Sequence, residues 1–427
     1  MLRLRIATFT GRLAGRISQL FGRGGSAVPG LVAERIDPRL IEKLAGSIPR
    51  IVVVTGTNGK TTTTKLLVGI LEASGVRVVT NPTGSNLARG IATRLIQVAS
   101  WRGTVDTDLA VFEVDEAAVR GLGSLLRPSV TVVTNLARDQ LDRYGELNTT
   151  AAHIGAALDH TATAVLNADD PMVAGLAGLA ETDVFFGGAD AVRAGMPDDR
   201  SLYGDDVAEK SGPSADLLIT LAEPAGDGQT VRLDDGSEQI DLGLQLPGVY
   251  NAYNAAAALL ASQTLDVETA VAVGAVAAVA PAWGRGQVIE YRGRRVKLLL
   301  VKNPAGLNQA IRLLCGLAPG TAVMIAINDN IADGRDVSWL WDARVEDLAP
   351  AGHHIVTSGI RALDMAVRLK YAGIEADWSD PDFGPALERF VEGIPEGETA
   401  YIVPTYTAML DLQRLLLPDT HRREAWM

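Results

Sequence analysis

The chain has 427 residues, of which 47% are apolar and 21% are charged, and its formal net charge is −12. This length predicts two or three domains, and the composition is that of a globular protein with substantial cores. The negative charge argues against nucleic-acid binding over the whole surface, and the single cysteine, Cys315, excludes an internal disulfide framework and a cysteine-rich zinc site.

The N-terminal segment, residues 1–23, is basic and amphipathic, and it contains no acidic residue. Its arginines interrupt the apolar centre that a signal peptide would need. A helix of this kind can rest on an anionic membrane surface or pack its apolar side chains on the rest of the protein. We expect packing, assign residues 1–46 to an N-terminal helical segment, and leave peripheral membrane contact open. The arginines are Arg3, Arg5, Arg12, Arg16 and Arg23.

Short apolar strands alternate with helix-compatible segments between residues 50 and 170. This alternation predicts a largely parallel, doubly wound sheet. Residues 187–217 are rich in Gly, Asp, Ser and Pro and predict an exposed insertion, after which residues 217–248 predict antiparallel strands at a sheet edge. The apolar segment 269–283 is too short to span a bilayer and predicts a buried helix. We assign these elements to one domain, residues 47–283.

A second alternating series begins after a hinge near residues 283–287. It runs from a strand at 294–301 to a helix near the C-terminus, and it includes a helix expected at 341–349. We assign residues 284–427 to a separate, Rossmann-like α/β domain. The sequence therefore predicts the α/β fold class, with a phosphate-binding, mostly parallel sheet followed by a smaller α/β domain.

The segment Thr-Gly-Thr-Asn-Gly-Lys-Thr at 55–61 joins the first strand of the larger domain to a helix. A general phosphate loop has the pattern G-x-x-x-x-G-K-[ST], and Val54 occupies the place of its first glycine. The segment still supplies two glycines, a free helix N-terminus, a lysine for the outer phosphates and a threonine for Mg²⁺. We predict ATP contacts from Gly56, Thr57, Asn58, Gly59, Lys60, Thr61 and Thr62.

A magnesium ion bound to phosphate usually has a carboxylate ligand at the end of a neighbouring strand. The strand Leu-Ala-Val-Phe-Glu-Val-Asp offers Glu113 and Asp115 on one face, and Glu116 is expected to begin the next helix. We predict Thr61 and Glu113 as the Mg²⁺ ligands. Two asparagines, Asn135 and Asn251, have the donors and acceptors that an adenine edge requires, although each taken alone is typical of a turn or a cap.

Several motifs together resemble the Mur ligase family: TGTNGKTTT, FEVDE, TNLARDQLDRYG, LNADDP, GVYNAYNAAAA and GRGQ. These enzymes activate a carboxylate as an acyl phosphate, which an amine then attacks. The resemblance implies a Mur ligase-type ATPase domain, ATP and Mg²⁺ as cofactors, adenine contacts from Asn135 and Asn251, and a nucleotide contact from Arg285.

Within that family, RGGSAVPG, RDQLDRYGE, KNPAGLNQ, NDNIADGRDVSWLWD and VPTYTAML resemble the MurT branch over essentially the whole chain. MurT subunits amidate the α-carboxylate of D-glutamate in the lipid II stem peptide, with ammonia from a glutaminase partner, GatD. Many carry a four-cysteine zinc ribbon, but this chain has no cysteine near residues 187–217. We therefore expect a shortened insertion and no zinc.

The segment 328–342 places four aspartates around two tryptophans, directly after a strand. One reading is a solvated acidic turn packed on the tryptophans. The MurT resemblance implies instead that one aspartate completes a Cys-His-Asp triad in the glutaminase, and we assign this role to Asp336 in preference to Asp333. The aspartates are Asp329, Asp333, Asp336 and Asp342.

Two other functions fit parts of the pattern. A stand-alone amino-acid ligase of the Mur or folylpolyglutamate type would form an amide with an amino acid and would need no partner. A non-catalytic scaffold would bind ATP only for conformational reasons. Lys60, Thr61 and Glu113 occur together, which favours an enzyme. A chain with a single cysteine is compatible with the reducing cytosol, so we expect a cytoplasmic protein. The lipid-linked substrate implied by the resemblance favours a position at the inner face of the plasma membrane.

Overall fold

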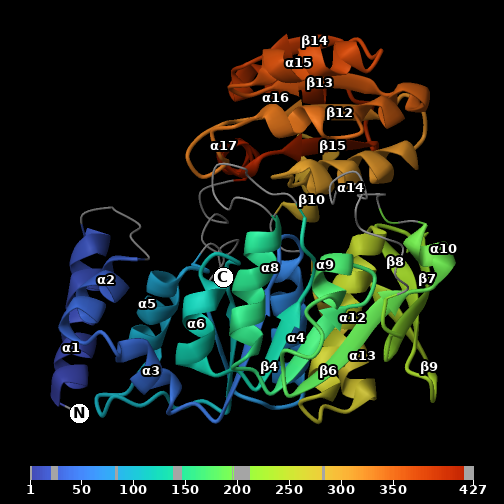
Figure 1. Ribbon diagram of the computed structural model, residues 1–427. Coiled ribbons are helices and arrows are strands. Elements are labelled where there is room, and N and C mark those ends of the chain that lie inside the picture. Colours follow the sequence, from blue (N-terminus) through green and yellow to red (C-terminus); the bar gives the residue numbers. More distant parts are fainter. Residues whose placement is uncertain are drawn as a thin grey trace.

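Two separate β-sheets organise the chain (Figure 1). The computed structural model describes residues 2–20, 27–81, 85–137, 147–194, 196, 212–280 and 284–417, apart from the side chains of residues 19, 20 and 285. The larger sheet has nine strands in the order β2-β3-β1-β4-β5-β6-β7-β8-β9, and the smaller has six in the order β10-β11-β15-β12-β13-β14. The expected hinge lies beside residues 281–283, which are outside the described residues.

The strands of the larger sheet are parallel from β2 to β7, and β7, β8 and β9 are antiparallel at one edge. The predicted parallel sheet and its antiparallel edge are thus confirmed, although β6 was not expected. The strands are β1 (Arg50–Thr55), β2 (Val78–Thr80), β3 (Leu109–Glu113), β4 (Val130–Val133), β5 (Thr163–Asn167), β6 (Thr182–Gly188), β7 (Leu217–Ala225), β8 (Gly228–Asp234) and β9 (Gln239–Leu244).

Both faces of the larger sheet are covered, so its central strands are mostly apolar. In β1, Val52 and Val54 pack on one face with α4, α12 and α13, while Ile51 and Val53 pack on the other with α3, α5, α6 and α8. The helices are α1 (Leu2–Leu20), α2 (Val28–Ile36), α3 (Leu40–Ala45), α4 (Lys60–Ala73), α5 (Ala88–Val98), α6 (Val119–Leu126), α8 (Leu147–Leu158), α9 (Pro171–Ala174), α10 (Asp190–Arg193), α12 (Val249–Gln263) and α13 (Thr269–Ala278).

The smaller sheet is parallel apart from β10, which pairs antiparallel with β11 and was not predicted. One face carries α14 and α15, and the other carries α16 and α17. The strands are β10 (Arg285–Tyr291), β11 (Arg294–Leu299), β12 (Ala322–Ala326), β13 (His354–Ser358), β14 (Trp378–Asp380) and β15 (Thr399–Pro404). The helices are α14 (Pro304–Cys315), α15 (Ala362–Tyr371), α16 (Phe383–Glu392) and α17 (Tyr406–Leu416).

The prediction of a helix at 341–349 is wrong. Two 3₁₀ turns, η1 (Ser338–Trp341) and η2 (Val345–Ala351), take its place. The side chain of Arg368 donates to the carbonyls of Leu340 at 3.0 Å and Ala343 at 2.7 Å, so these carbonyls accept from a side chain of α15. Pro350 inside η2 also lacks the N–H that a longer helix would use.

Two further expectations are modified. Within the segment 269–283, α13 covers Thr269–Ala278, and only Ala272, Ala275 and Val276 of this helix are buried. Of the insertion expected at 187–217, the structure describes the end of β6, the short helix α10 and the start of β7, while residues 195 and 197–211 lie outside the described residues. Among the described residues, no helix has the length and apolar character needed to cross a bilayer.

The carboxyl ends of the parallel strands of the larger sheet face the smaller domain (Figure 1). In doubly wound sheets, ligands bind at this edge. Asn303, the cap of α14, donates through Nδ2 to Oδ1 of Asn58 in the loop after β1, at 3.2 Å. The two domains therefore meet directly at the predicted phosphate loop.

Candidate active site

The loop between β1 and α4 is shaped by two glycines. Gly56 and Gly59 have φ values of 122° and 86°, in the region that side chains rarely adopt. A Cβ on Gly56 would lie 2.4 Å from Oγ1 of Thr134, and one on Gly59 would lie 2.1 Å from Oδ1 of Asn254. The loop is thus packed closely against two neighbouring elements. Val54, which replaces the usual first glycine, is fully buried in β1 and lies before the turn begins.

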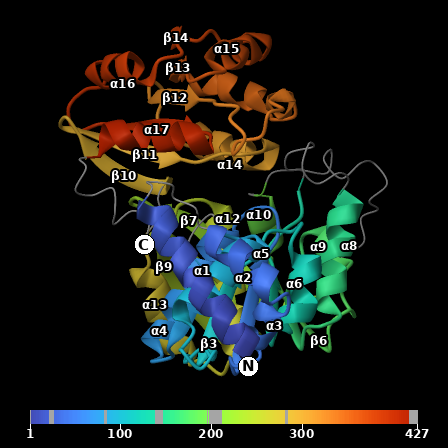
Figure 2. The ribbon, with the colours of Figure 1, turned by 90° about the vertical axis from the view of Figure 1, so that its left-hand side faces the viewer.

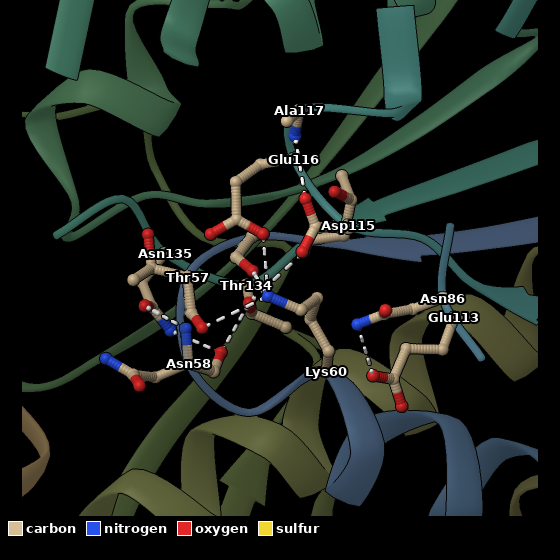
Figure 3. Close-up of polar contacts among 12 residues, drawn as sticks. Thr57, Asn58, Lys60, Asn86, Glu113, Asp115, Glu116, Ala117, Thr134 and Asn135 are labelled. Atoms are coloured by element: carbon tan, nitrogen blue, oxygen red, sulfur yellow. Dashed lines mark hydrogen bonds and ion pairs between the residues drawn. The ribbon is translucent and has the colours of Figure 1, made fainter. Parts of the chain in front are cut away.

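The end of β4 holds the backbone of this loop in place. Asn135 accepts from the backbone N–H of Asn58 at 3.0 Å through Oδ1 and donates to its carbonyl at 2.9 Å through Nδ2 (Figure 3). The carbonyl of Asn135 also accepts from the N–H of Thr57 at 2.8 Å. Both ends of the Asn135 amide are therefore engaged with the loop, and the predicted adenine contact stays a prediction.

Lys60 begins α4 and points back into the loop (Figure 3). Its Nζ donates to Oε2 of Glu116 at 2.7 Å, to the carbonyl of Thr57 at 3.2 Å and to the carbonyl of Gly56. Burial alone would lower the pKa of Lys60, but the charge and hydrogen bond of Glu116, with the nearby Asp115 and Glu113, outweigh burial and raise it. The ammonium group is therefore charged and held at the mouth of the loop.

Glu116 is a site residue that sequence reasoning missed. It was expected to begin a helix, but α6 begins at Val119, and Glu116 is 1% exposed beside Lys60. Its Oε1 is buried and makes no hydrogen bond among the described residues. A buried acid needs a cationic partner, and among the described residues Lys60 is the cation that pairs with Glu116. The acidic residues at the end of β3 indicated that a carboxylate could lie near Lys60, but their spacing could not show which of them pairs with it.

The predicted magnesium ligands lie on adjacent elements. Glu113 ends β3 opposite Val54 of β1, and Thr61 is the second residue of α4. Both side chains are buried, and Glu113 accepts from Nδ2 of Asn86 at 3.3 Å. A carboxylate and a hydroxyl beside a phosphate loop match the oxygen ligands that Mg²⁺ prefers. Asp115 lies beyond the end of the strand, where it accepts from the N–H of Ala117 at 3.1 Å.

Helix α12 closes the other side of the loop. Asn251 donates to the carbonyl of Pro247 at 2.7 Å and accepts from Nδ2 of Asn254 at 3.1 Å. Asn254, which we did not single out from the sequence, accepts from the hydroxyl of Thr63 at 3.4 Å. The N-A-Y-N spacing places both asparagines on one helix face and could have indicated the second. The adenine contact of Asn251 stays a prediction.

Two residues of the smaller domain, Arg285 and Asn303, also belong to the candidate site. The backbone of Arg285 begins β10, but its side chain is outside the described residues, so its nucleotide contact is also a prediction. Asn303 is fully buried, and it caps α14 by accepting from the N–H of Gly306 at 2.8 Å while its Nδ2 reaches the phosphate loop. An asparagine before a proline at a helix start predicts this cap, but the contact across the domains needed the tertiary structure.

Gly59→Ala should destabilise the protein more than Gly75→Ala. Both glycines have nearly the same φ, 86° and 83°, but a Cβ at Gly75 meets nothing within 4 Å. The backbone strain is therefore matched, and overpacking against Asn254 should lower the free energy of unfolding of Gly59→Ala by about a further 1–3 kcal/mol. Urea denaturation measures both, and equal losses would contradict the packing described for this loop.

Comparison with known proteins follows the two domains. Residues 54–262 match the family model of the Mur ligase middle domain, and residues 300–409 match that of the MurT ligase C-terminal domain. The MurT subunit of lipid II isoglutaminyl synthase from Streptococcus pneumoniae is 33% identical over 97% of this chain and 98% of its own length. The corresponding Staphylococcus aureus subunit is 30% identical over 85% of this chain and 87% of its own.

Solved structures share the fold. MurF ligase from Thermotoga maritima, in complex with ADP, has a TM-score of 0.67 at 16% identity, over 91% of this chain and 82% of that chain. Folylpolyglutamate synthase from Mycobacterium tuberculosis, complexed with ADP and AMPPCP, has a TM-score of 0.63 at 15% identity, over 89% and 95% of the two chains. The predicted fold class is confirmed.

The nine-stranded sheet with its glycine-containing loop after β1, the second α/β domain and the match to the Mur ligase middle domain define a ligase of the Mur ligase class. The identity to the pneumococcal subunit over almost the full length of both chains is more specific than this class. The chain belongs to the MurT family of ligase subunits.

Proposed function

We propose that this chain uses ATP to amidate the α-carboxylate of D-glutamate in the lipid II stem peptide. One observation carries the proposal: the phosphate loop, with Lys60, lies in a chain that is 33% identical over 97% of its length to a MurT subunit of lipid II isoglutaminyl synthase. The solved relatives with bound ADP support ATP as the nucleotide. The name of that synthase includes glutamine hydrolysis, which supports ammonia as the nitrogen source.

The reaction has two steps. An oxygen of the carboxylate attacks the terminal phosphorus of ATP, ADP leaves, and an acyl phosphate forms. The lone pair of ammonia then attacks the acyl carbon, the bond from carbon to the phosphate oxygen breaks, and the nitrogen loses one proton to the leaving phosphate, which gives the amide and inorganic phosphate. A carboxylate is already a nucleophile at neutral pH, so the first step needs no general base.

The residues of the site act by position and charge. The N–H groups at the start of α4 and the ammonium of Lys60 would hold the outer phosphates, and Glu116 keeps that ammonium charged and in place before they bind. Thr61 and Glu113 would hold Mg²⁺, which neutralises phosphate charge when it is bound. Asn135, Asn251 and Arg285 keep their predicted nucleotide contacts.

The glutaminase partner, of the GatD type, would dock around Asp336. Asp336 is partly exposed, and its Oδ1 accepts from the N–H of Ser338 at 2.8 Å, a bond that lowers the pKa of the carboxyl group. It is therefore ionised and accessible, as an orienting aspartate must be. Asp333 is buried and accepts from the N–H of Thr407 at 2.7 Å, so it ties its loop to the start of α17. This difference supports Asp336 over Asp333.

Exposed apolar side chains occur in the loop that contains Asp336 and in the segments that follow it, which include η1 and α15. On α15, side chains spaced four residues apart are exposed, and Tyr371 packs edge to face on Trp341 of η1 with ring centroids 5.3 Å apart. Aromatic and aliphatic side chains gathered in this way are typical of protein interfaces. The exposed residues are Ile331, Trp341, Ile360, Leu363, Val367 and Tyr371.

The assay of choice combines purified chain, ATP and lipid II with either ammonium or glutamine and a GatD-type glutaminase. We expect ADP and amidated lipid II in equal amounts with either nitrogen source, and no product from glutamine without the partner. Mass spectrometry measures the amide, and a coupled assay measures ADP. Product that contains an added amino acid would identify a stand-alone ligase, and absence of ATP turnover would identify a scaffold. We place this activity in the cytoplasm, at the inner face of the plasma membrane.

A further inference from the structure

Helix α1 exposes a stripe of large apolar side chains. The members of the stripe are spaced by four, three, four and four residues, so they share one face of a helix with 3.6 residues per turn. Each is between 46% and 73% exposed, which is unusual for five large apolar side chains on one helix. The stripe consists of Leu2, Ile6, Phe9, Leu13 and Ile17.

The opposite face of α1 is packed on the larger domain, so the stripe cannot turn inward. Leu4, Ala7 and Gly11 are buried, and a Cβ on Gly11 would lie 3.0 Å from the carbonyl of Pro29 and 3.2 Å from Ile96 of α5. Figure 2 shows α1 on the outer surface, in front of α5. The packing expected from the sequence is therefore present, and it uses only one of the two apolar faces.

Two arginines fasten the helix at its sides. Arg12 donates from Nε to the carbonyl of Ile96 at 2.9 Å and from Nη2 to that of Gln97 at 3.3 Å, at the C-terminus of α5. Arg3 donates to the carbonyl of Ile36, the last residue of α2. Cations are favoured at helix C-termini, where carbonyls lack partners. These bonds fix the rotation of α1 and keep the apolar stripe directed outward.

The surroundings of the stripe are basic and include an exposed tryptophan. The helix contains four arginines and no acidic residue, although the whole chain has a net charge of −12. Arg5 and Arg102 lie 5.4 Å and 5.3 Å from the ring centroid of Trp101, which is 71% exposed. Arg16 is exposed farther along the helix. An apolar stripe with arginines and a tryptophan beside it is the composition of helices that lie in a membrane interface.

We propose that the outward face of α1 docks on an anionic lipid surface. The apolar stripe would enter the boundary between headgroups and acyl chains, Arg5 and Arg16 would meet lipid phosphates, and Trp101 would lie at the interface. The positive charge of this helix in a strongly acidic chain favours an anionic lipid bilayer over a second copy of the chain, which would bring like charges together.

The position of α5 relates this surface to the site. Arg12 of α1 binds the C-terminal end of α5, and Asn86, just before the N-terminal end of α5, donates to Glu113. Eleven helical residues span about 16 Å, so one short helix separates the docking surface from the catalytic edge. The proposal that α1 binds lipid does not depend on the proposed function. The further idea that this position gives the site access to a lipid-linked substrate rests on that function.

Sedimentation with vesicles tests the proposal on the full chain, alone and with its glutaminase. Wild type should bind phosphatidylcholine vesicles that contain phosphatidylglycerol, and binding should weaken in high salt and on phosphatidylcholine alone. Phe9→Glu/Leu13→Glu should weaken binding by at least about tenfold. Leu179→Glu/Leu415→Glu is the control, because it also introduces two glutamates at exposed apolar positions, 40% and 41% exposed, that lie outside α1.

Unchanged binding of the Phe9→Glu/Leu13→Glu variant would overturn the proposal, as would wild type that ignores anionic vesicles. A wild type that dimerises through this face without binding lipid would also overturn it, and sedimentation equilibrium detects that outcome. ATP turnover with a water-soluble stem-peptide substrate should be the same in variant and wild type. Failure of amidation in both proteins would contradict the proposed function but would leave the vesicle result intact.

Discussion

Lys60→Ala should reduce amidation with either nitrogen source by at least about 100-fold, the loss typical for removal of one group that stabilises transition-state charge. The lysine is buried at the N-terminus of α4, and its ammonium is held within the loop by Glu116 and by two backbone carbonyls. No other cation among the described residues bonds to these loop carbonyls. Calorimetric titration should also show weaker ATP binding. ADP release and mass spectrometry of lipid II measure the reaction.

The controls separate chemistry from folding. Lys65→Ala removes an exposed lysine from the same helix and should leave the rate unchanged. Lys60→Ala leaves Glu116 buried without a cation, which costs about 3–5 kcal/mol in comparable pairs, so the variant should also melt earlier. Lys60→Ala/Glu116→Gln removes both charges and should recover part of that stability while it stays inactive. A folded double variant with wild-type amidation would refute the phosphate-binding role of Lys60.

Asp336→Asn should abolish amidation from glutamine and leave amidation from added ammonium nearly unchanged. If Asp336 orients the catalytic histidine of the glutaminase, an asparagine preserves shape but removes the negative charge, which in comparable triads lowers the rate by about 10⁴-fold. The proposed synthetase site lies in the other domain, at the loop between β1 and α4, so its chemistry should not change. Glutamate release and lipid II amidation are measured in the same samples.

The matched control for this prediction is Asp342→Asn, which alters an exposed aspartate in the same segment. It should leave both activities intact. Size-exclusion chromatography must show that Asp336→Asn still binds the glutaminase, so that lost hydrolysis is not lost assembly. Loss of the ammonium-dependent activity, or an unaffected glutaminase, would reject the assignment of Asp336.

The fold was predictable where local pattern and burial agree. The alternation of strands and helices predicted the parallel sheet, and the turn residues around Gly56 and Gly59 predicted the loop that follows β1. Prediction failed where partners distant in sequence decide the backbone. The turns η1 and η2 replace a helix because Arg368, on a later element, takes the carbonyls of Leu340 and Ala343.

The site shows the same division. The motif predicted phosphate contacts from Lys60 and its neighbours, because a phosphate loop needs glycines, a lysine and a threonine at fixed spacing. The inward turn of Glu116, the Asn303 contact across the domains and the brace from Asn135 depend on which elements pack together. Residues from separate strands meet at one edge only after the sheet has formed, so no local pattern contains those contacts.

The N-terminal helix α1 shows most clearly how far the sequence alone can predict the structure. The sequence by itself determined that α1 is amphipathic and basic, since the residue spacing sets which side chains share a face. The sequence could not determine which apolar side chains of α1 would be buried, because apolar residues occur on two sides of this helix. The tertiary structure decided this: Gly11 allows close packing on α2 and α5, Arg12 finds the free carbonyls of α5, and the stripe with Phe9 is left facing outward.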